Sequence, residues 1–115
     1  MPIKVLVAED DRDVRRLACL ILKMDGYDVL AAEDGVAALE VSEEHVVDIL
    51  LTDVRMPRMD GVELARNLAR RCPELKVVYM SGYTDVDIPL GRHCMFLPKP
   101  FDASVLSGAV KKMLV

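Results

Sequence analysis

Three carboxylates in this chain follow apolar runs directly, at positions where they could do chemistry. Glu9 and Asp10 come after the apolar run over 3–8, and Asp53 comes after the run over 48–52. If the fold brings them together, their negative charges repel, and a cation between them relieves that repulsion. An all-oxygen cluster of this kind favours a hard cation, and Mg2+ that keeps several waters fits it best. These residue types therefore predict a magnesium site.

A hydroxyl and an ammonium group follow two further apolar runs. Ser81 comes directly after the run over 76–80, and Lys99 is the second residue after the run over 94–97. Together with a metal ion, such groups can hold the three equatorial oxygens of a phosphoryl group during transfer. A carboxylate can act as the nucleophile, and its attack on phosphorus gives an aspartyl phosphate. The combined set predicts phosphoryl-transfer chemistry.

Strands and helices are predicted to alternate along the chain, which brings these residues to one edge. Strands are expected over 3–8, 28–32, 48–52, 76–80 and 94–97. Apolar residues at helical spacing predict helices over 13–24, 36–45, 61–71 and 103–114. Near-continuous apolar strands that alternate with helices indicate a parallel sheet covered on both faces. Ligands of such sheets bind beyond the carboxyl ends of the strands, where all the polar groups above are expected.

Composition and charge narrow the class of protein. With 115 residues, 52% of them hydrophobic and 30% charged, the chain is expected to form one globular domain. The net charge of −4 argues against general binding of nucleic acid or of anionic membranes, both of which favour a basic face. No apolar run approaches the roughly 18 residues of a membrane-spanning helix, and no signal-peptide pattern is present. Three cysteines without C-x-x-C spacing suggest neither a disulfide framework nor zinc, so a cytoplasmic location is expected.

The chain resembles the receiver domain of two-component response regulators. The resemblance rests on four stretches in this order, VLVAEDD, LLTDVRMPRMDG, VVYMSG and LPKPF. It implies a doubly wound, flavodoxin-like α/β fold with five parallel strands in the order 2-1-3-4-5. It also implies a single receiver domain over 1–115, with no output domain in this chain. The stretch SGYTD further resembles receivers that are attached to hybrid sensor histidine kinases.

The resemblance assigns a role to each candidate metal ligand. Asp53 resembles the phospho-acceptor and would also bind Mg2+. Asp10 would bind Mg2+ directly, Glu9 would bind it through a water, and the backbone carbonyl of Arg55 would complete the set.

The same resemblance assigns the groups that would hold and report the phosphoryl group. Lys99 resembles the lysine that pairs with it, and Ser81 resembles the switch hydroxyl. Phe96 stands at the position of the rotating switch aromatic. The bond between Lys99 and Pro100 resembles the cis peptide of the family.

The function implied is phosphorylation-dependent signalling in a two-component system or phosphorelay. A sensor histidine kinase or a histidine phosphotransfer protein would donate the phosphoryl group to Asp53, and a downstream protein would receive the signal. Direct contact with nucleic acid and membrane insertion are not expected. Two alternatives remain: a non-switching interaction module or phosphate sink, and an aspartate-nucleophile phosphatase. The phosphatase is disfavoured, because its general acid would stand at position 55, which is Arg55 here.

One segment departs from the family pattern. Only 17 residues, 82–98, separate Ser81 from Lys99, which is fewer than usual for the family. Pro89 and Gly91 lie within this segment, and the interior of a helix tolerates neither residue well. The fourth helix of the family, expected near 84–93, is therefore predicted to be short, distorted or absent.

Overall fold

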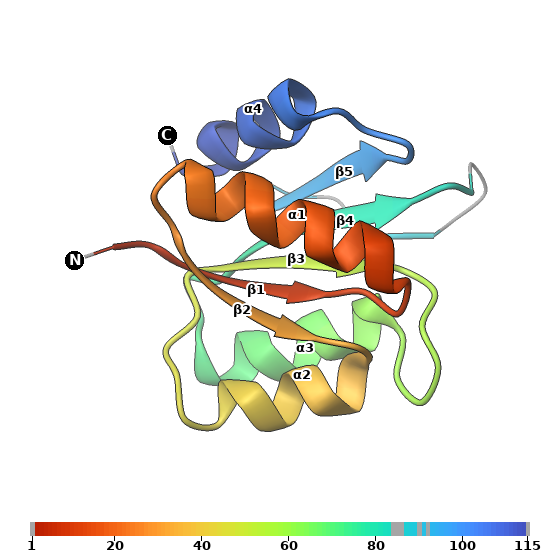
Figure 1. Cartoon of the computed structure of the whole chain (residues 1–115). Helices are drawn as coiled ribbons and strands as arrows, with labels where there is room; N and C mark the ends of the chain where they lie inside the picture. Colours follow the sequence, from red (N-terminus) through yellow and green to blue (C-terminus); the bar gives the residue numbers. More distant parts are fainter. Residues whose placement is uncertain (1, 84–86, 90, 92, 115) are drawn as a thin grey trace.

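Over the residues that the structure describes, the chain folds into a parallel sheet with two helices on each face. The computed structural model describes residues 2–83, 87–89, 91 and 93–114. The strands are β1 (Lys4–Ala8), β2 (Asp28–Ala32), β3 (Ile49–Asp53), β4 (Lys76–Ser81) and β5 (Cys94–Pro98). The helices are α1 (Arg12–Met24), α2 (Gly35–Ser42), α3 (Gly61–Arg71) and α4 (Ala103–Leu114). Figure 1 shows α1 and α4 against one face of the sheet and α2 and α3 against the other.

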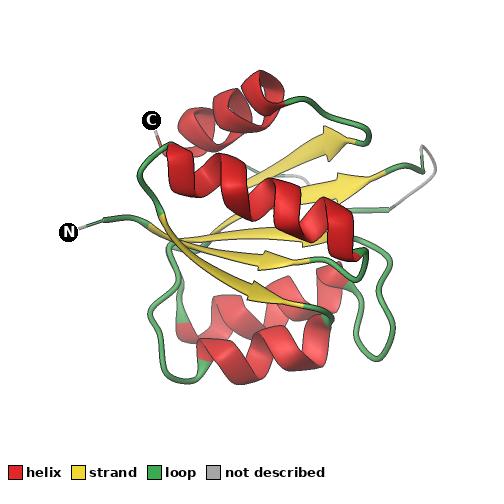
Figure 2. Cartoon of the chain, in the orientation of Figure 1, coloured by secondary structure: helices red, strands yellow, loops and turns green. Residues whose placement is uncertain are grey.

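The strand order is β2-β1-β3-β4-β5, and every pairing is parallel. This confirms the predicted doubly wound topology, and Figure 2 shows all five strands pointing toward the same side. The carboxyl ends of the strands therefore share one rim. Each face of the sheet has its own apolar core, and β3 supplies both: Ile49 and Leu51 pack toward α1 and α4, and Leu50 packs toward α2 and α3.

Side-chain caps fix where the helices begin, and those beginnings determine the shape of the rim. Asp11 caps α1 by accepting from the backbone N–H groups of Asp13 and Val14, and Asp60 caps α3 by accepting from Glu63. The predicted end of the second helix, at residue 45, was wrong. The observed helix stops at Ser42, whose hydroxyl donates to the Leu39 carbonyl at 2.6 Å.

The connection from β4 to β5 agrees with the predicted loss of a regular fourth helix, as far as it is described. Residues 87–89, 91 and 93 are not helical. The rest of the predicted segment, at 84–86, 90 and 92, lies outside the described residues. Among the described helices, none is long and apolar enough to cross a membrane.

Phe96 is 38% exposed on β5, the edge strand at this end of the sheet. Side chains alternate along a strand. Met95 packs toward the α1 and α4 face and Cys94 packs toward the α2 and α3 face, so Phe96 shares the side of Cys94. The exposure of this aromatic ring shows that the described helices leave that part of the face open.

Candidate functional site

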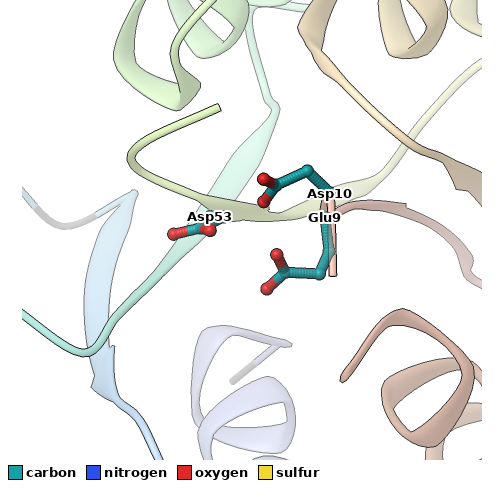
Figure 3. Close-up of side chains that lie close together, drawn as sticks. All are labelled: Glu9, Asp10 and Asp53. Atoms are coloured by element: carbon teal, nitrogen blue, oxygen red, sulfur yellow. The ribbon is translucent and has the colours of Figure 1, made fainter. Parts of the chain in front are cut away.

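The carboxyl ends of β1 and β3 bring three carboxylates together. Glu9, Asp10 and Asp53 each offer an oxygen, and these oxygens all lie within 4.8 Å of one another. Figure 3 shows the carboxylates of Glu9 and Asp10, which are consecutive residues, both turned toward the strand that carries Asp53. Asp53 is the last residue of β3 and pairs with Met80, so the sheet itself fixes its position.

The three carboxylates differ in burial. Glu9 is fully buried, Asp53 is 9% exposed, and Asp10 faces solvent. Burial raises the pKa of Glu9 to about 7, and the nearby Asp53 charge adds to this effect, although hydrogen bonds from Lys99 and from the Asp11 backbone oppose it. When Glu9 is ionised, its buried charge is repelled by Asp53, and a bound cation would offset that repulsion.

Lys99 supplies the ammonium group of the site. Its Nζ forms ion pairs with Glu9 and with Asp53, the latter at 3.3 Å. Burial alone would lower the pKa of Lys99, but the hydrogen bond to Glu9 and the charge of Asp53 outweigh burial, so the pKa is raised. The backbone N–H of Lys99 donates to the Ser81 carbonyl at 2.9 Å, and the bond to Pro100 is cis, as predicted.

Ser81 ends β4 and is 1% exposed. Its hydroxyl oxygen accepts a hydrogen bond from the backbone N–H of Tyr83 at 3.0 Å. The neighbouring strand end and the Lys99 backbone thus place this hydroxyl at the rim. Phe96, by contrast, lies two positions before Pro98 on β5 and is not part of the charged cluster.

Two glycines and a threonine shape the backbone around Asp53, and the sequence pattern gave no sign of this role for Gly35 or Thr52. A Cβ atom on Gly61 would come 2.1 Å from the Asp53 carbonyl oxygen, so α3 can begin here only with glycine. The buried hydroxyl of Thr52 donates to the same Asp53 carbonyl at 2.9 Å. Gly35 allows an equally close approach of Met59, where a Cβ would lie 2.4 Å from the Met59 carbonyl oxygen.

A cation–π contact joins the loops after β3 and β4. The guanidinium of Arg55 lies 4.2 Å from the centre of the Tyr83 ring. Arg55 follows Asp53 by two residues, and Tyr83 follows Ser81 by two residues. That matched spacing after adjacent strands was the available signal for this contact, which the sequence interpretation missed.

An apolar hollow of about 370 Å3 opens beside the ammonium group. Its lining comes from α1, from the end of β4 and from the segment that joins β5 to α4. The lining residues are Val14, Leu17, Gly82, Lys99, Pro100 and Phe101. Leu17 is 47% exposed despite its place in an apolar helical pattern, so α1 presents apolar surface next to the rim.

The residue set fits a hard divalent cation. Three carboxylates lie together, two of them paired with the Lys99 ammonium, and oxygens are the ligands that Mg2+ prefers. The exposure of Asp10 gives an ion access from solvent. The predicted residues Glu9, Asp10, Asp53 and Lys99 thus come together, with Ser81 beside them.

Comparison with known proteins agrees with this geometry. The chain is 38% identical to the response regulator receiver protein CpdR of Brucella abortus (strain 2308), over 97% of each chain. It is 41% identical to the sensor kinase CckA of the same organism, over 96% of this chain but only 12% of that protein. The crystal structure of the receiver domain from the hybrid histidine kinase CckA has a TM-score of 0.85 and 36% identity, and the match covers 97% of this chain and 99% of that one. Residues 5–111 match the response regulator receiver domain, and the chain belongs to that family of signalling domains.

Proposed function

We propose that this domain accepts a phosphoryl group on Asp53 and uses it as a signal. The observation that carries the proposal is the ion pair of Lys99 with Asp53 beside a second and a third carboxylate. The sheet holds the carboxylate of Asp53 at the rim, and the Lys99 ammonium, 3.3 Å from it, would pair with an oxygen of the phosphoryl group. The match of this chain to the response regulator receiver domain, and its similarity to a response regulator receiver protein, also support the proposal.

The transfer itself is a displacement at phosphorus. An oxygen of Asp53 forms the new P–O bond while the P–N bond of a donor phosphohistidine breaks, and the imidazole keeps the electron pair. Lys99 would face the equatorial oxygens with positive charge. Asp10, Asp53 and the Arg55 carbonyl would hold Mg2+ directly, and Glu9 would hold it through a water. When bound, Mg2+ supplies charge neutralisation at the phosphoryl oxygens. Later attack by water on phosphorus returns the Asp53 carboxylate and inorganic phosphate.

Ser81 and Phe96 would change conformation in response to the phosphoryl group. Phosphorylation adds roughly 1.5 to 2 negative charges and strong acceptor oxygens at Asp53. The Ser81 hydroxyl, which accepts from Tyr83, can donate its own proton to such an oxygen. Phe96 is 38% exposed and therefore has apolar area to gain by moving inward. An NMR titration with Mg2+ and then beryllofluoride tests this step: shifts that reach Ser81 and Phe96 support switching, and shifts confined to the acidic rim refute it.

The phosphoryl donor is proposed to be a sensor histidine kinase or a histidine phosphotransfer protein. A protein donor has to cover the rim to bring its histidine to Asp53, and the hollow beside Lys99 offers apolar area for that contact. Leu17 and Leu20, at 47% and 57% exposure, extend this surface along α1. A Leu17→Glu change should slow transfer from a phosphorylated histidine phosphotransfer domain and leave labelling by acetyl phosphate unchanged. Equal slowing of both reactions would contradict this role.

Labelling by a small phosphodonor tests the proposal without a protein partner. The chain is incubated with acetyl phosphate, with and without Mg2+, and its intact mass is measured. We expect the mass of one phosphoryl group to be gained only with Mg2+. The Asp10→Asn variant should lose most of this labelling, because it removes a direct ligand. Labelling that is equal with and without Mg2+ would overturn the proposal.

A further inference from the structure

The loop between β3 and α3 carries the backbone that surrounds the acceptor. Both of its ends are fixed: the N–H of Val54 donates to the Met80 carbonyl at 3.1 Å, and the N–H of Gly61 donates to the Val54 carbonyl at 2.8 Å. The middle of the loop, however, is the part that includes Arg55, whose carbonyl is a proposed metal ligand. Contacts that fix the middle of the loop would therefore help to position the Arg55 carbonyl.

Arg58 ties the middle of this loop to the start of α2. Its guanidinium makes a two-pronged contact with Asp34: Nε lies 2.9 Å from Oδ2, and Nη2 lies 2.9 Å from Oδ1 and 2.7 Å from Oδ2. The side chain of Asp34 is 8% exposed, whereas that of Arg58 is 56% exposed. Paired geometry of this kind fixes orientation as well as distance.

The backbone of Arg58 is unusual for a residue with a side chain. Its φ is 71°, in the left-handed region that favours glycine. A glycine at position 58 would suit this backbone better, so the local conformation gains nothing from arginine. The contact with Asp34 is what the arginine side chain adds.

Asp34 is itself held firmly. Its Oδ1 accepts from the backbone N–H of Ala37 at 2.8 Å as the cap of α2. That hydrogen bond, together with the Arg58 guanidinium, holds the pKa of Asp34 below its ordinary value. The next residue, Gly35, packs against Met59 so closely that no Cβ would fit. Two consecutive residues at the start of α2, its cap and its first residue, thus contact two consecutive residues of the acceptor loop.

We propose that Asp34 and Arg58 are positioning residues, which hold the β3–α3 loop so that Arg55 and Asp53 present their oxygens to the metal and phosphoryl group. Neither residue lies in the charged cluster, and the pair acts through the loop backbone between Asp53 and Arg58. The inference rests on the proposed function. Partners outside the ligand shell of a metal site typically change its affinity by about 10-fold or more when removed, because the ligands lose their orientation.

Two variants remove the charge pair and are expected to leave the fold intact. Arg58→Gly suits the left-handed backbone and removes the guanidinium. Asp34→Asn keeps an oxygen that can cap α2, since asparagine caps helices as well as aspartate does, but it removes the charge of the pair. Arg70→Gln, at an exposed arginine of α3, is the control for loss of a surface cation.

The Mg2+ concentration at half saturation is measured by NMR titration for each protein, together with the melting temperature. We expect that concentration to rise about 10-fold in Arg58→Gly and in Asp34→Asn, and to rise no further in the double variant, because both changes remove one interaction. The melting temperature of Arg58→Gly should not fall. Arg70→Gln should stay within about 2-fold of the wild type.

Metal-free spectra give a second readout. The amide resonances of Val54, Arg55 and Met56 should shift in both single variants before any Mg2+ is added. Wild-type affinity and unshifted loop resonances in Arg58→Gly would overturn the positioning role while the proposed function stands. A wild-type chain that binds no Mg2+ would overturn the proposed function, and the inference with it.

Discussion

Both ends of the sheet carry charged side chains, but the two groups differ in balance and in burial. At the amino ends of the strands, the Nζ of Lys4 lies 3.6 Å from Asp28 and 3.2 Å from the Nδ1 of His45. The backbone N–H of Lys4 also donates to Asp48 at 2.8 Å. Asp28 and Asp48 are exposed. Lys4 therefore lies close to two acidic side chains at this end, and both of them have access to water.

At the carboxyl ends, three carboxylates lie together and two of them are buried. The Lys99 ammonium pairs with Glu9 and Asp53, and the Arg15 guanidinium donates to the Glu9 carbonyl at 2.8 Å. The pKa of Glu9 is raised to about 7 mainly because it is buried. The contrast indicates that carboxylates buried close together point to a ligand more strongly than an exposed network of charges does. The amino-end group has the ordinary features of a structural surface network.

The two ends of β3 provide the sharpest test of this contrast. Asp53 ends the strand, and Asp48 immediately precedes it. We expect Asp53→Asn to abolish labelling by acetyl phosphate, because an amide cannot act as the nucleophile. Asp48→Asn should change the labelling rate by less than about 2-fold. Loss of labelling in Asp48→Asn with the fold intact would break the distinction between the two ends.

Lys99, the lysine at the carboxyl ends of the strands, should have the next largest effect on the labelling rate. Lys99→Met removes the ammonium that faces the transferred oxygens, and labelling should slow by about 100-fold or more. Initial rates at saturating Mg2+ measure this, so that weaker metal binding does not contribute. A rate within a few-fold of the wild type would show that Lys99 serves only to neutralise Glu9.

Stability against pH tests the burial of Glu9. The folded chain keeps the Glu9 proton up to a pH of about 7, whereas the unfolded chain loses it near the ordinary value of 4.5. Between these values the folded state binds more protons, so the free energy of unfolding of the metal-free protein should fall as pH rises, by up to about 3 kcal/mol. Denaturant titrations at several pH values should show this fall in the wild type and much less of it in Glu9→Gln. Addition of Mg2+ should oppose the fall, since ionised Glu9 is the form that a cation favours.

The amino-end lysine should have the smallest effect. Lys4→Met breaks an ion pair in which the side chains are 26% and 48% exposed, so it should cost at most about 1 kcal/mol of stability. Its labelling rate should match that of the wild type. A loss of labelling would show that the amino end of β1 communicates with the acceptor, which nothing in the contacts of Lys4 suggests.

The general fold and the charged rim could be predicted because they depend on local pattern. Apolar runs gave the strands, and the residues that directly follow each strand must reach the same rim in a parallel sheet. The position of Asp53 at the end of β3 and the cap formed by Asp60 follow from such patterns.

The contacts that shape the loops could not be predicted in this way. Asp34 and Arg58 are 24 residues apart, and their pairing depends on a left-handed backbone that no periodicity reveals. The end of α2 was also misplaced, because Glu43, Glu44 and His45 do not break a helical pattern, whereas their backbone N–H groups donate to carbonyls three residues back instead of four. Side-chain partnerships across loops depend on tertiary packing, which sequence pattern does not specify.

The most direct test of the central claim is to identify the modified residue chemically. The chain is labelled with acetyl phosphate and Mg2+, then reduced with borohydride, which converts a phosphorylated aspartate to homoserine. Peptide mass spectrometry then locates the homoserine. The account predicts homoserine at position 53 alone, formed only when Mg2+ is present. Homoserine at Asp10 or at Asp48, or none at position 53, would contradict it.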